Sequence, residues 1–259
     1  MVKILSDSTC DLSQELLEKY DISILPLHIL LGEKEYCDGV DITPDEIFQW
    51  SDAQKTTPKT SAPALDMAME MLEPFVKEKQ PVICFSISED MSTSANVMRM
   101  AASELEAEDL VTVIDSASLS TGIGLLVLHA AEMAQAGKTV EEIQTEIEEL
   151  KPKVRASFVV DTLVYLYRGG RCSGLAAMFG SALHLHPMIV VENGKMHSSK
   201  KYRGKLSKVI LDYAKDLKEQ MEQARSERVF ITHSGCSPEV VEKVRSYLEE
   251  LHIFDEILI

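Results

Sequence analysis

The pattern of apolar and polar residues predicts alternating strands and helices through the first 150 residues. Short apolar runs typical of buried strands cover residues 2–5, 82–87 and 111–114. A hydroxyl-rich turn follows each run, and apolar residues then recur at helical spacing over residues 13–20, 93–102 and 119–136. Alternation of this kind predicts a parallel sheet with helices on both faces.

The segment between the first two of these runs predicts a hairpin and two further helices. Residues 22–31 have the composition of a second strand, which turns back into residues 36–40 as an antiparallel hairpin. The sequence Thr43-Pro44-Asp45-Glu46 has the spacing of a capping box with proline in the first turn, and so predicts a helix start. Thr60 and Ser61 precede another helical pattern, which predicts a second hydroxyl-rich helix start.

The pattern changes after about residue 150, which predicts a second domain. A hairpin around Asn193-Gly194 is the strongest turn signal in the chain. The remaining segments predict strands at residues 154–160, 228–232 and 255–259, and helices at residues 162–168, 173–185 and 204–223 and after Ser237-Pro238. We therefore expect an α/β domain over residues 1–150 and a smaller α+β domain over residues 151–259.

Hydroxyl side chains collect in the turns that follow the predicted parallel strands, at residues 6–9, 88–94 and 115–118. The carboxyl ends of parallel strands meet at one edge of the sheet, so we expect these hydroxyls to converge, with Thr60 and Ser61 within reach. Ser92, Thr93 and Ser94 also lie where a helix begins, and the unpaired N–H groups there attract anions. The structural alternative is that Ser92 or Ser94 is only an N-cap.

The central turn has no basic residue of its own before Arg99. Neutral donors without a cation suit a single carboxylate better than a chain of phosphates. The sequence therefore predicts a carboxylate site at this edge of the sheet.

The overall charge narrows the range of partners. The chain has 26 Lys and Arg against 42 Asp and Glu, a formal net charge of -16. Nucleic acids and anionic membranes attract basic proteins, so we expect no nucleic acid partner and no stable membrane insertion. No apolar run approaches the roughly 18 residues of a spanning helix, and the N-terminus lacks a signal-peptide core. The five cysteines form no C-x-x-C pair, so we expect a cytoplasmic protein with reduced thiols, no metal site and no cofactor.

Short motifs in a fixed order resemble the DegV family over nearly the whole chain. They are residues 6–12 (SDSTCDL), 60–63 (TSAP), 91–92 (MS), 115–116 (DS), 161–171 (DTLVYLYRGGR) and 202–204 (YRG). The resemblance implies a two-domain α/β fold that encloses a long-chain fatty acid between its domains. It also implies a non-catalytic binding protein of the bacterial fatty acid kinase system, which presents the acid to a kinase partner for phosphorylation.

Carried over by position, the resemblance implies that Thr60 and Ser92 hold the carboxylate. It also implies that Arg171 and Arg203 contact the acyl phosphate or the kinase. With no catalytic residue expected, the other candidate site residues are Ser61, Thr93 and Ser94 beside the carboxylate and, at the border of the site, Ser8, Thr9, Ser116 and His233.

Two departures from the family pattern concern the head-group site. Ser92-Thr93-Ser94 stands where the family usually has Ser-Gly-Thr, and we expect the threonine to narrow the approach to the backbone. The family also has a histidine in a Gly-x-His-x-Gly-Pro-Gly stretch beyond the last strand. Either the natural chain continues past Ile259 or its head-group site is incomplete.

Two features of the second half add to the fatty acid hypothesis. Residues 176–180 (AAMFG) are the favoured lining for the acyl tail, with plain helix packing as the alternative. Over the whole chain, the twelve methionines suit an adaptable apolar cavity. A basic stretch predicts either a docking surface for an acidic partner or a solvated hairpin face. It comprises Lys195, Lys200, Lys201, Arg203, Lys205 and Lys208.

Two other functions stay open. The same hydroxyl cluster would suit a hydrolase or phosphotransferase acting on a small anion, although the sequence has neither a G-x-S-x-G elbow nor a Walker motif. Cys10 begins a helix, but no histidine stands beside it in the sequence. The third hypothesis is a lipid sensor with a regulatory protein partner.

Overall fold

Four parallel strands form the central sheet of the first half of the chain. In the computed structural model, which describes residues 1–171 and 185–259, the order of these strands is β2-β1-β6-β7. They are β1 (Lys3–Asp7), β2 (Ile22–Leu25), β6 (Val82–Ser86) and β7 (Val111–Asp115). Every residue of β1 and β6 is buried, as expected for the middle of a parallel sheet. The predicted parallel sheet is confirmed.

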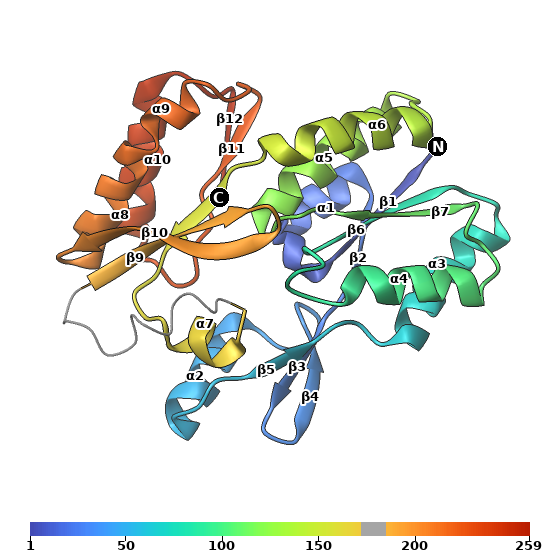
Figure 1. Ribbon diagram of the computed structural model, residues 1–259, viewed down its shortest axis with the longest axis horizontal. Helices are drawn as coiled ribbons and strands as arrows, with labels where there is room; N and C mark the ends of the chain where they lie inside the picture. Colours follow the sequence, from blue (N-terminus) through green and yellow to red (C-terminus); the bar gives the residue numbers. More distant parts are fainter. Residues whose placement is uncertain (172–184) are drawn as a thin grey trace. The chain divides into compact units, whose positions relative to one another are not determined.

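Helices cover both faces of this sheet, as predicted (Figure 1). On one face lie α3 (Leu65–Lys77) and α4 (Ser94–Glu104), whose Ala68, Leu72 and Met98 pack against Leu5 and Cys84 of the sheet. On the other face lie α1 (Gln14–Tyr20) and α5 (Thr121–Gln135), with α6 (Val140–Leu150) packed on α5. A capping box formed by Thr139 and Glu142 starts α6.

A small antiparallel sheet of order β4-β3-β5 follows β2. Its strands are β3 (His28–Leu31), β4 (Lys34–Cys37) and β5 (Lys59–Ser61), and α2 (Pro44–Gln54) begins at the predicted capping box. The prediction of one strand over residues 22–31 is wrong. Pro26 has no N–H to donate to a ladder, and the N–H of Leu27 bonds to the Ser8 hydroxyl, so the chain leaves the parallel sheet here.

The prediction that Thr60 and Ser61 begin a helix is also wrong. They lie in β5, where Thr60 pairs with Ile29 and Ser61 with His28 of β3. The residue before a proline disfavours the helical region, and Pro63 therefore keeps Ala62 extended. Helix α3 starts only at Leu65, and its N-cap residue makes no side-chain cap.

The described part of the chain divides into two compact units. The first contains residues 1–156 and 191–195, and the second contains residues 157–190 and 196–259. Among the described helices, none combines the length and the apolar character needed to cross a membrane.

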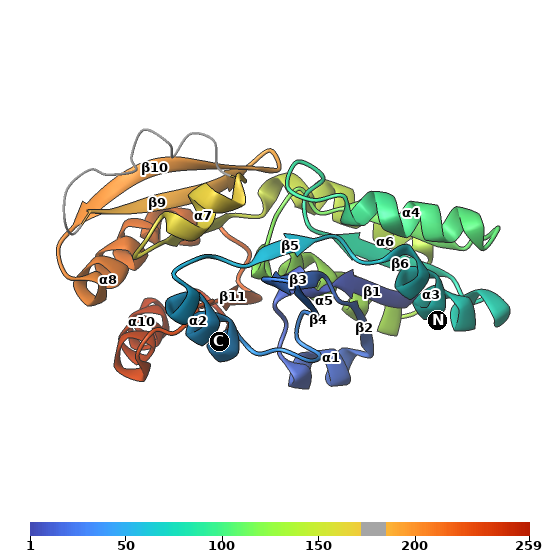
Figure 2. The ribbon, with the colours of Figure 1, turned by 90° about the horizontal axis from the view of Figure 1, so that it is seen from below.

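The second unit is built on a three-stranded sheet of order β10-β9-β8. Its strands and helices are β8 (Ala156–Val159), α7 (Val164–Gly169), β9 (Leu185–Glu192), β10 (Lys195–Arg203), α8 (Leu206–Asp216), α9 (Lys218–Met221), β11 (Arg228–Phe230), α10 (Pro238–Leu251) and β12 (Glu256–Leu258). Helix α8 runs along the sheet, with Val209 packed against Met188 and Tyr202 (Figure 2). The predicted helix over residues 173–185 lies outside the described residues apart from Leu185, which begins β9.

The tip of the β9–β10 hairpin belongs to the first unit. Asn193 and Gly194 both have positive φ, as their turn signal predicts. The hydroxyl of Ser88 donates to the carbonyl oxygen of Gly194 at 2.8 Å, and Lys195 Nζ lies 3.5 Å from Asp90 Oδ1. The turn after β6 is therefore fixed to the hairpin tip.

Gly194→Ala should destabilise this contact by strain and by collision. A Cβ on Gly194 would lie 2.6 Å from the Ser88 hydroxyl oxygen, at a φ of +77°. Gly137 has a φ of +79° with nothing within 4 Å of the same position, so Gly137→Ala isolates the strain. In urea unfolding we expect Gly137→Ala to lose about 1 kcal/mol and Gly194→Ala at least about 1 kcal/mol more. Equal losses would contradict the packing of the tip on Ser88.

Candidate functional site

The candidate site lies where the carboxyl ends of the parallel strands meet, which we call the carboxyl edge. The turns at this edge are residues 8–10 after β1, residues 87–93 after β6 and residues 116–120 after β7. The chain adds β2 on one side of β1 and later adds β6 on the other side, so the strand order reverses at β1. Ligands of open α/β sheets bind at such a reversal of strand order. Asp7 and Ile87 flank this position.

Asp7 is the last residue of β1 and its side chain is completely buried. Its Oδ1 accepts hydrogen bonds from the Thr9 N–H at 3.2 Å and the Thr9 hydroxyl at 2.5 Å, and its Oδ2 accepts one from the Ile87 N–H at 2.9 Å. Asp7 therefore joins the turn after β1 to the turn after β6.

Burial raises the pKa of Asp7 to about 6. Loss of hydration favours the neutral acid, and this effect exceeds the stabilisation of the charge by Thr9, Ile87 and Ser94. In the described part of the chain Asp7 forms no ion pair that would offset its charge. The centre of the carboxyl edge thus holds an acid that titrates near neutral pH.

The three consecutive hydroxyls of the central turn differ in exposure. Ser94 is buried, Ser92 is partly exposed and Thr93 is exposed. The hydroxyl oxygens of Ser92 and Ser94 lie 2.9 Å apart, and Ser92 also accepts a bond from the Ser94 N–H at 3.3 Å. The N-cap of α4 is Thr93, so the alternative that Ser92 or Ser94 is the N-cap is wrong, although Ser92 does accept the N–H of the first helical residue. Ser92 is also the member of the pair that a ligand can reach.

Thr93 occupies its position without backbone strain. Its φ is -93° and its ψ is 13°, a conformation open to any residue. Its side chain caps no N–H and faces solvent. The backbone at this position does not require glycine. Thr93 should therefore affect the approach of a head group only through the bulk of its side chain.

The turns after β1 and β7 lie at the same edge, but their hydroxyls bond within the protein. Ser8 donates to Asp38 Oδ2 at 2.7 Å and accepts from the Leu27 N–H at 3.1 Å. The buried Ser116 hydroxyl accepts from the Ser118 N–H at 3.1 Å. These side chains, like that of Thr9, hold the turns in shape.

Thr60 and Ser61 reach this region through the small antiparallel sheet. Ser61 pairs with His28, the residue after Leu27, whose N–H is bonded to Ser8. Both side chains are exposed. Their part in a shared head-group site with Ser92 stays a prediction.

Charged groups near the central turn are mainly acidic, and the cations beside them are paired. Asp115 accepts from the N–H groups of Glu89 at 3.2 Å and Ala117 at 2.9 Å. Arg99 lies 2.5 Å from Glu89, and Lys195 pairs with Asp90. A bound anion would therefore meet neutral donors rather than a free cation, which agrees with the predicted preference for a carboxylate.

The remaining predicted residues belong to the second unit. His233 is exposed in the loop after β11, and Arg203 is exposed on β10. Arg171 is exposed and donates to the Gly169 carbonyl oxygen at 2.5 Å. Their roles stay predictions, and the predicted tail-lining residues 176–180 lie outside the described residues.

The Cys10 thiol is unsuited to nucleophilic catalysis. It is 1% exposed, and burial raises its pKa to about 11. A thiol in this environment is protonated at neutral pH, whereas the thiolate is the nucleophile. Within the described residues no group of three His, Cys, Asp or Glu side chains is placed to hold a metal.

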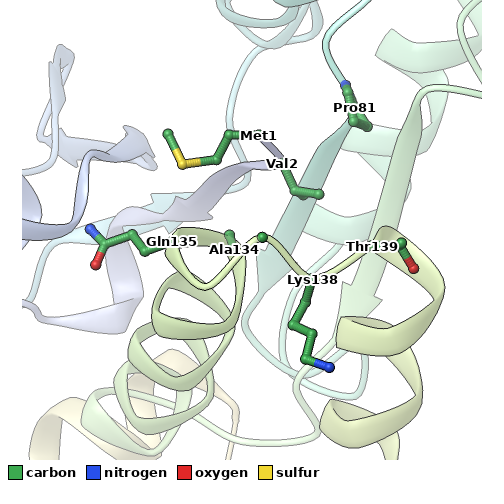
Figure 3. Close-up of a pocket in the computed structure, with 8 residues that line it drawn as sticks. Met1, Val2, Pro81, Ala134, Gln135, Lys138 and Thr139 are labelled. Atoms are coloured by element: carbon green, nitrogen blue, oxygen red, sulfur yellow. The ribbon is translucent and has the colours of Figure 1, made fainter.

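A hollow of about 410 Å³ lies at the opposite edge of the sheet (Figure 3). Met1, Val2 and Pro81 line it from the amino ends of β1 and β6, with Ala134 and Lys138 on the other side. The hollow lies at the amino ends of the parallel strands, whereas the hydroxyl-rich turns of the predicted site follow their carboxyl ends. We therefore assign the candidate site to the carboxyl edge.

Sequence reasoning missed the role of Asp7 and of Ser88. Asp7 lies in the first hydroxyl-rich turn of the sequence. An acidic residue at the end of a buried strand indicates a carboxylate that needs several hydrogen-bond donors, and this signal could have found it. Ser88 had no local signal, since its partner Gly194 lies 106 residues along the chain.

Comparison with known proteins places this geometry in a family. A family model described as an uncharacterised protein of the DegV family matches residues 1–258. The chain belongs to the DegV family. A DegV domain-containing protein of Clostridium perfringens is 38% identical over 203 residues, covering 78% of this chain and 72% of that one. One from Deinococcus radiodurans is 31% identical, covering 98% and 89%.

Solved structures of DegV proteins share the fold. A DegV family protein from Thermus thermophilus, described by its fatty acid binding, has a TM-score of 0.87 and 29% identity, covering 99% of this chain and 91% of that one. A stearic acid-binding protein from Eubacterium ventriosum has a TM-score of 0.86 and 32% identity, covering 99% and 90%. Both are described as binding fatty acids.

Asp7→Asn should remove a pH dependence from the stability of the folded protein. The folded-state pKa of about 6 exceeds the ordinary 3.8, so the ionised side chain destabilises the fold above pH 6. This penalty decreases as the pH falls from 6 to 4, where both states become protonated. The amide of asparagine cannot accept from both Thr9 and the Ile87 N–H, so the variant loses a hydrogen bond at every pH. Relative to the parent, we expect its free energy of unfolding in urea to be about 1–3 kcal/mol more favourable at pH 7.5 than at pH 4. An equal difference from the parent at both pH values would contradict the raised pKa.

Proposed function

We propose that this DegV protein binds a long-chain fatty acid with the carboxyl group at the carboxyl edge. The observation that carries the proposal is the partly exposed Ser92 hydroxyl, held at the reversal of strand order by its contact with the buried Ser94 hydroxyl at 2.9 Å. The DegV structures from Thermus thermophilus and Eubacterium ventriosum are described as fatty-acid-binding and support the same ligand class.

Ser92, Thr60 and Ser61 would supply neutral donors to the head group. The side chains of Thr60 and Ser61 are exposed on the edge strand β5, so their hydroxyls are accessible to a ligand. Thr93 is exposed beside Ser92, while Ser94 is buried and acts through Ser92. These hydroxyls would orient one carboxyl group through hydrogen bonds, but they carry no positive charge to offset that of a carboxylate.

The acyl tail would supply most of the affinity. Each buried CH₂ contributes about 0.8 kcal/mol, whereas a neutral hydrogen bond contributes about 1 kcal/mol net. A tail of a dozen or more carbons therefore outweighs the hydroxyls. We propose from the family resemblance that the tail lies between the two domains.

The enzymatic alternative is less well supported. The buried acid Asp7, whose pKa burial raises to about 6, is the feature of this edge that would suit acid–base chemistry with Ser94 as the nucleophile. However, Ser94 is 0% exposed, so its oxygen has no access to a substrate. We therefore propose a binding protein and not a hydrolase or phosphotransferase.

Removing donors from the proposed head-group site should weaken binding modestly. One lost hydrogen bond corresponds to about a fivefold rise in Kd for Ser92→Ala, and the double variant with Thr60→Val should lose about 10- to 30-fold. Ser103→Ala is the control, because its hydroxyl bonds to Glu108 at the far end of α4. The measurements are fatty acid titration and mass spectrometry of lipid retained on purification. Absence of any retained or bound fatty acid in the parent protein would contradict the proposal.

We also propose that a fatty acid kinase is the partner and docks on the basic stretch. Two of its residues are already engaged, since Lys200 pairs with Asp216 and Lys195 with Asp90. Lys201 and Arg203 are exposed on β10 and, within the described residues, form no ion pair. With Arg171, they would meet an acidic partner or a phosphorylated head group.

Charge reversal at Lys201 and Arg203 should separate docking from binding. In the variant with Lys201→Glu and Arg203→Glu, a fatty acid kinase should phosphorylate the bound acid at least about tenfold more slowly. The two introduced glutamates would repel an acidic surface of the kinase. Lipid retained on purification should not change. The double reversal Lys218→Glu with Lys243→Glu, on α9 and α10, changes the net charge by the same amount and controls for overall charge. Lost lipid retention in the double variant would argue against a docking role.

A further inference from the structure

Both ring nitrogens of His186 contact main-chain carbonyl oxygens in the second unit. His186 lies near the start of β9, and its Nδ1 is 3.3 Å from the oxygen of Val160. Its Nε2 is 3.1 Å from the oxygen of Gly204. The residue is 4% exposed, so water is largely excluded from both contacts.

Two ring protons are needed to satisfy both contacts. A carbonyl oxygen only accepts hydrogen bonds, and a neutral imidazole has one N–H to donate. In the neutral ring, one nitrogen would direct its lone pair at a carbonyl oxygen and leave that acceptor without a donor. The imidazolium, which has an N–H on each nitrogen, is therefore the form that fits this position.

The contact with Gly204 fixes the chain directly after Arg203. On the other side of Arg203, Tyr202 is buried, and its hydroxyl donates to Asp216 Oδ2 at 2.7 Å. The exposed Arg203 side chain therefore extends from a strand end that is anchored on both sides. One of these two anchors is the His186 ring.

Loss of one proton from the ring would release the Gly204 contact. Asp161 Oδ1 lies 3.6 Å from Nδ1, so this nitrogen faces a carboxylate as well as the Val160 carbonyl. The remaining proton is therefore held better at Nδ1 than at Nε2. The Gly204 carbonyl would lose its donor, whereas the Val160 carbonyl would keep it.

We propose that protonated His186 is a positioning residue that holds Arg203 in place to contact the acidic surface of a kinase. The inference rests on the proposed docking of a kinase at Lys201 and Arg203, and it adds a pH dependence to that function. Docking weakens as the His186 ring loses its second proton, because the chain beside Arg203 is then anchored on one side only.

Charged side chains from the neighbouring strand ends act on the ring with opposite signs. Asp161, in the loop after β8, favours the charged ring, although its side chain is 72% exposed and water screens it. Arg203 and Lys205 flank Gly204 and are exposed, so their repulsion of the ring is screened as well. Strand β8 itself has no charged residue.

The helices packed on the sheet add little charge near the ring. Helix α8 contributes Tyr213, which stays neutral because burial raises its pKa, and Asp216, which pairs with Lys200. Helix α7 packs through Leu166, and its Arg168 is exposed. The charge of the ring therefore depends mainly on the two carbonyls and on Asp161.

Nuclear magnetic resonance of the full chain, with histidine and glycine labelled, tests the contact directly. The signals of the His186 ring are those that disappear in His186→Gln. As the pH rises from 5 to 8.5, Nε2 should lose its proton, and the carbonyl carbon of Gly204 should shift with the same midpoint. The carbonyl of Gly137, in the first unit, should not follow. A ring whose protonation does not change over this range, or a Gly204 carbonyl that does not follow the ring, would overturn the proposal.

Two substitutions of His186 separate the charge from the shape of the side chain. His186→Lys keeps a positive charge with three donors, whereas His186→Gln has donors and no charge. Each rate of phosphorylation is divided by that of the parent with the same kinase, which removes the pH dependence of the kinase itself. His186→Gln should be about fivefold slower than the parent at pH 6 and equal to it at pH 8.5. His186→Lys should equal the parent at pH 6 and exceed it about fivefold at pH 8.5.

The control is His252→Asn, an exposed histidine at the end of α10, which should equal the parent at both pH values. Fatty acid retained on purification should be unchanged in all three variants. If Lys201→Glu with Arg203→Glu slows phosphorylation but the two His186 variants show no pH pattern, the role of His186 alone is overturned. If Lys201→Glu with Arg203→Glu is phosphorylated as fast as the parent, the proposed docking is overturned with it.

Discussion

The buried carboxylate of Asp7 is the interaction on which the carboxyl edge depends. It ends β1 and accepts hydrogen bonds from the N–H and hydroxyl of Thr9 and from the N–H of Ile87, the residue after β6. A charge removed from water is tolerated only when its acceptor positions are filled. Each turn that supplies a donor must therefore keep its shape, and the position of Ser92 follows from that of Ser94.

This constraint divides the hydroxyls of the edge into two kinds. Ser8, Thr9 and Ser116 bond within the protein and hold the turns, so they have little left to offer a ligand. Ser92 is partly exposed, and Thr60 is exposed on β5. A count of hydroxyls in the sequence therefore overestimates the site, because most of them satisfy backbone groups and buried acids.

The sequence was sufficient where the signal is local. The parallel sheet and the helix at Thr43 follow from apolar runs and a capping box a few residues long. It was insufficient where pairing is distant: Thr60 becomes a strand residue because Ile29 lies opposite it. Asp7 is the extreme case. Its hydrogen-bond partner Ile87 is 80 residues away, and no local sequence pattern predicts that these two residues meet.

An acidic chain that is proposed to bind an acid meets an electrostatic difficulty. The net charge is -16, and Arg99 and Lys195 beside the central turn are each paired with an acid. Attraction between opposite charges therefore contributes little to holding a carboxylate here. The affinity must come from burial of apolar surface, which is indifferent to charge. In the proposed complex the hydroxyls would then set the orientation of the ligand.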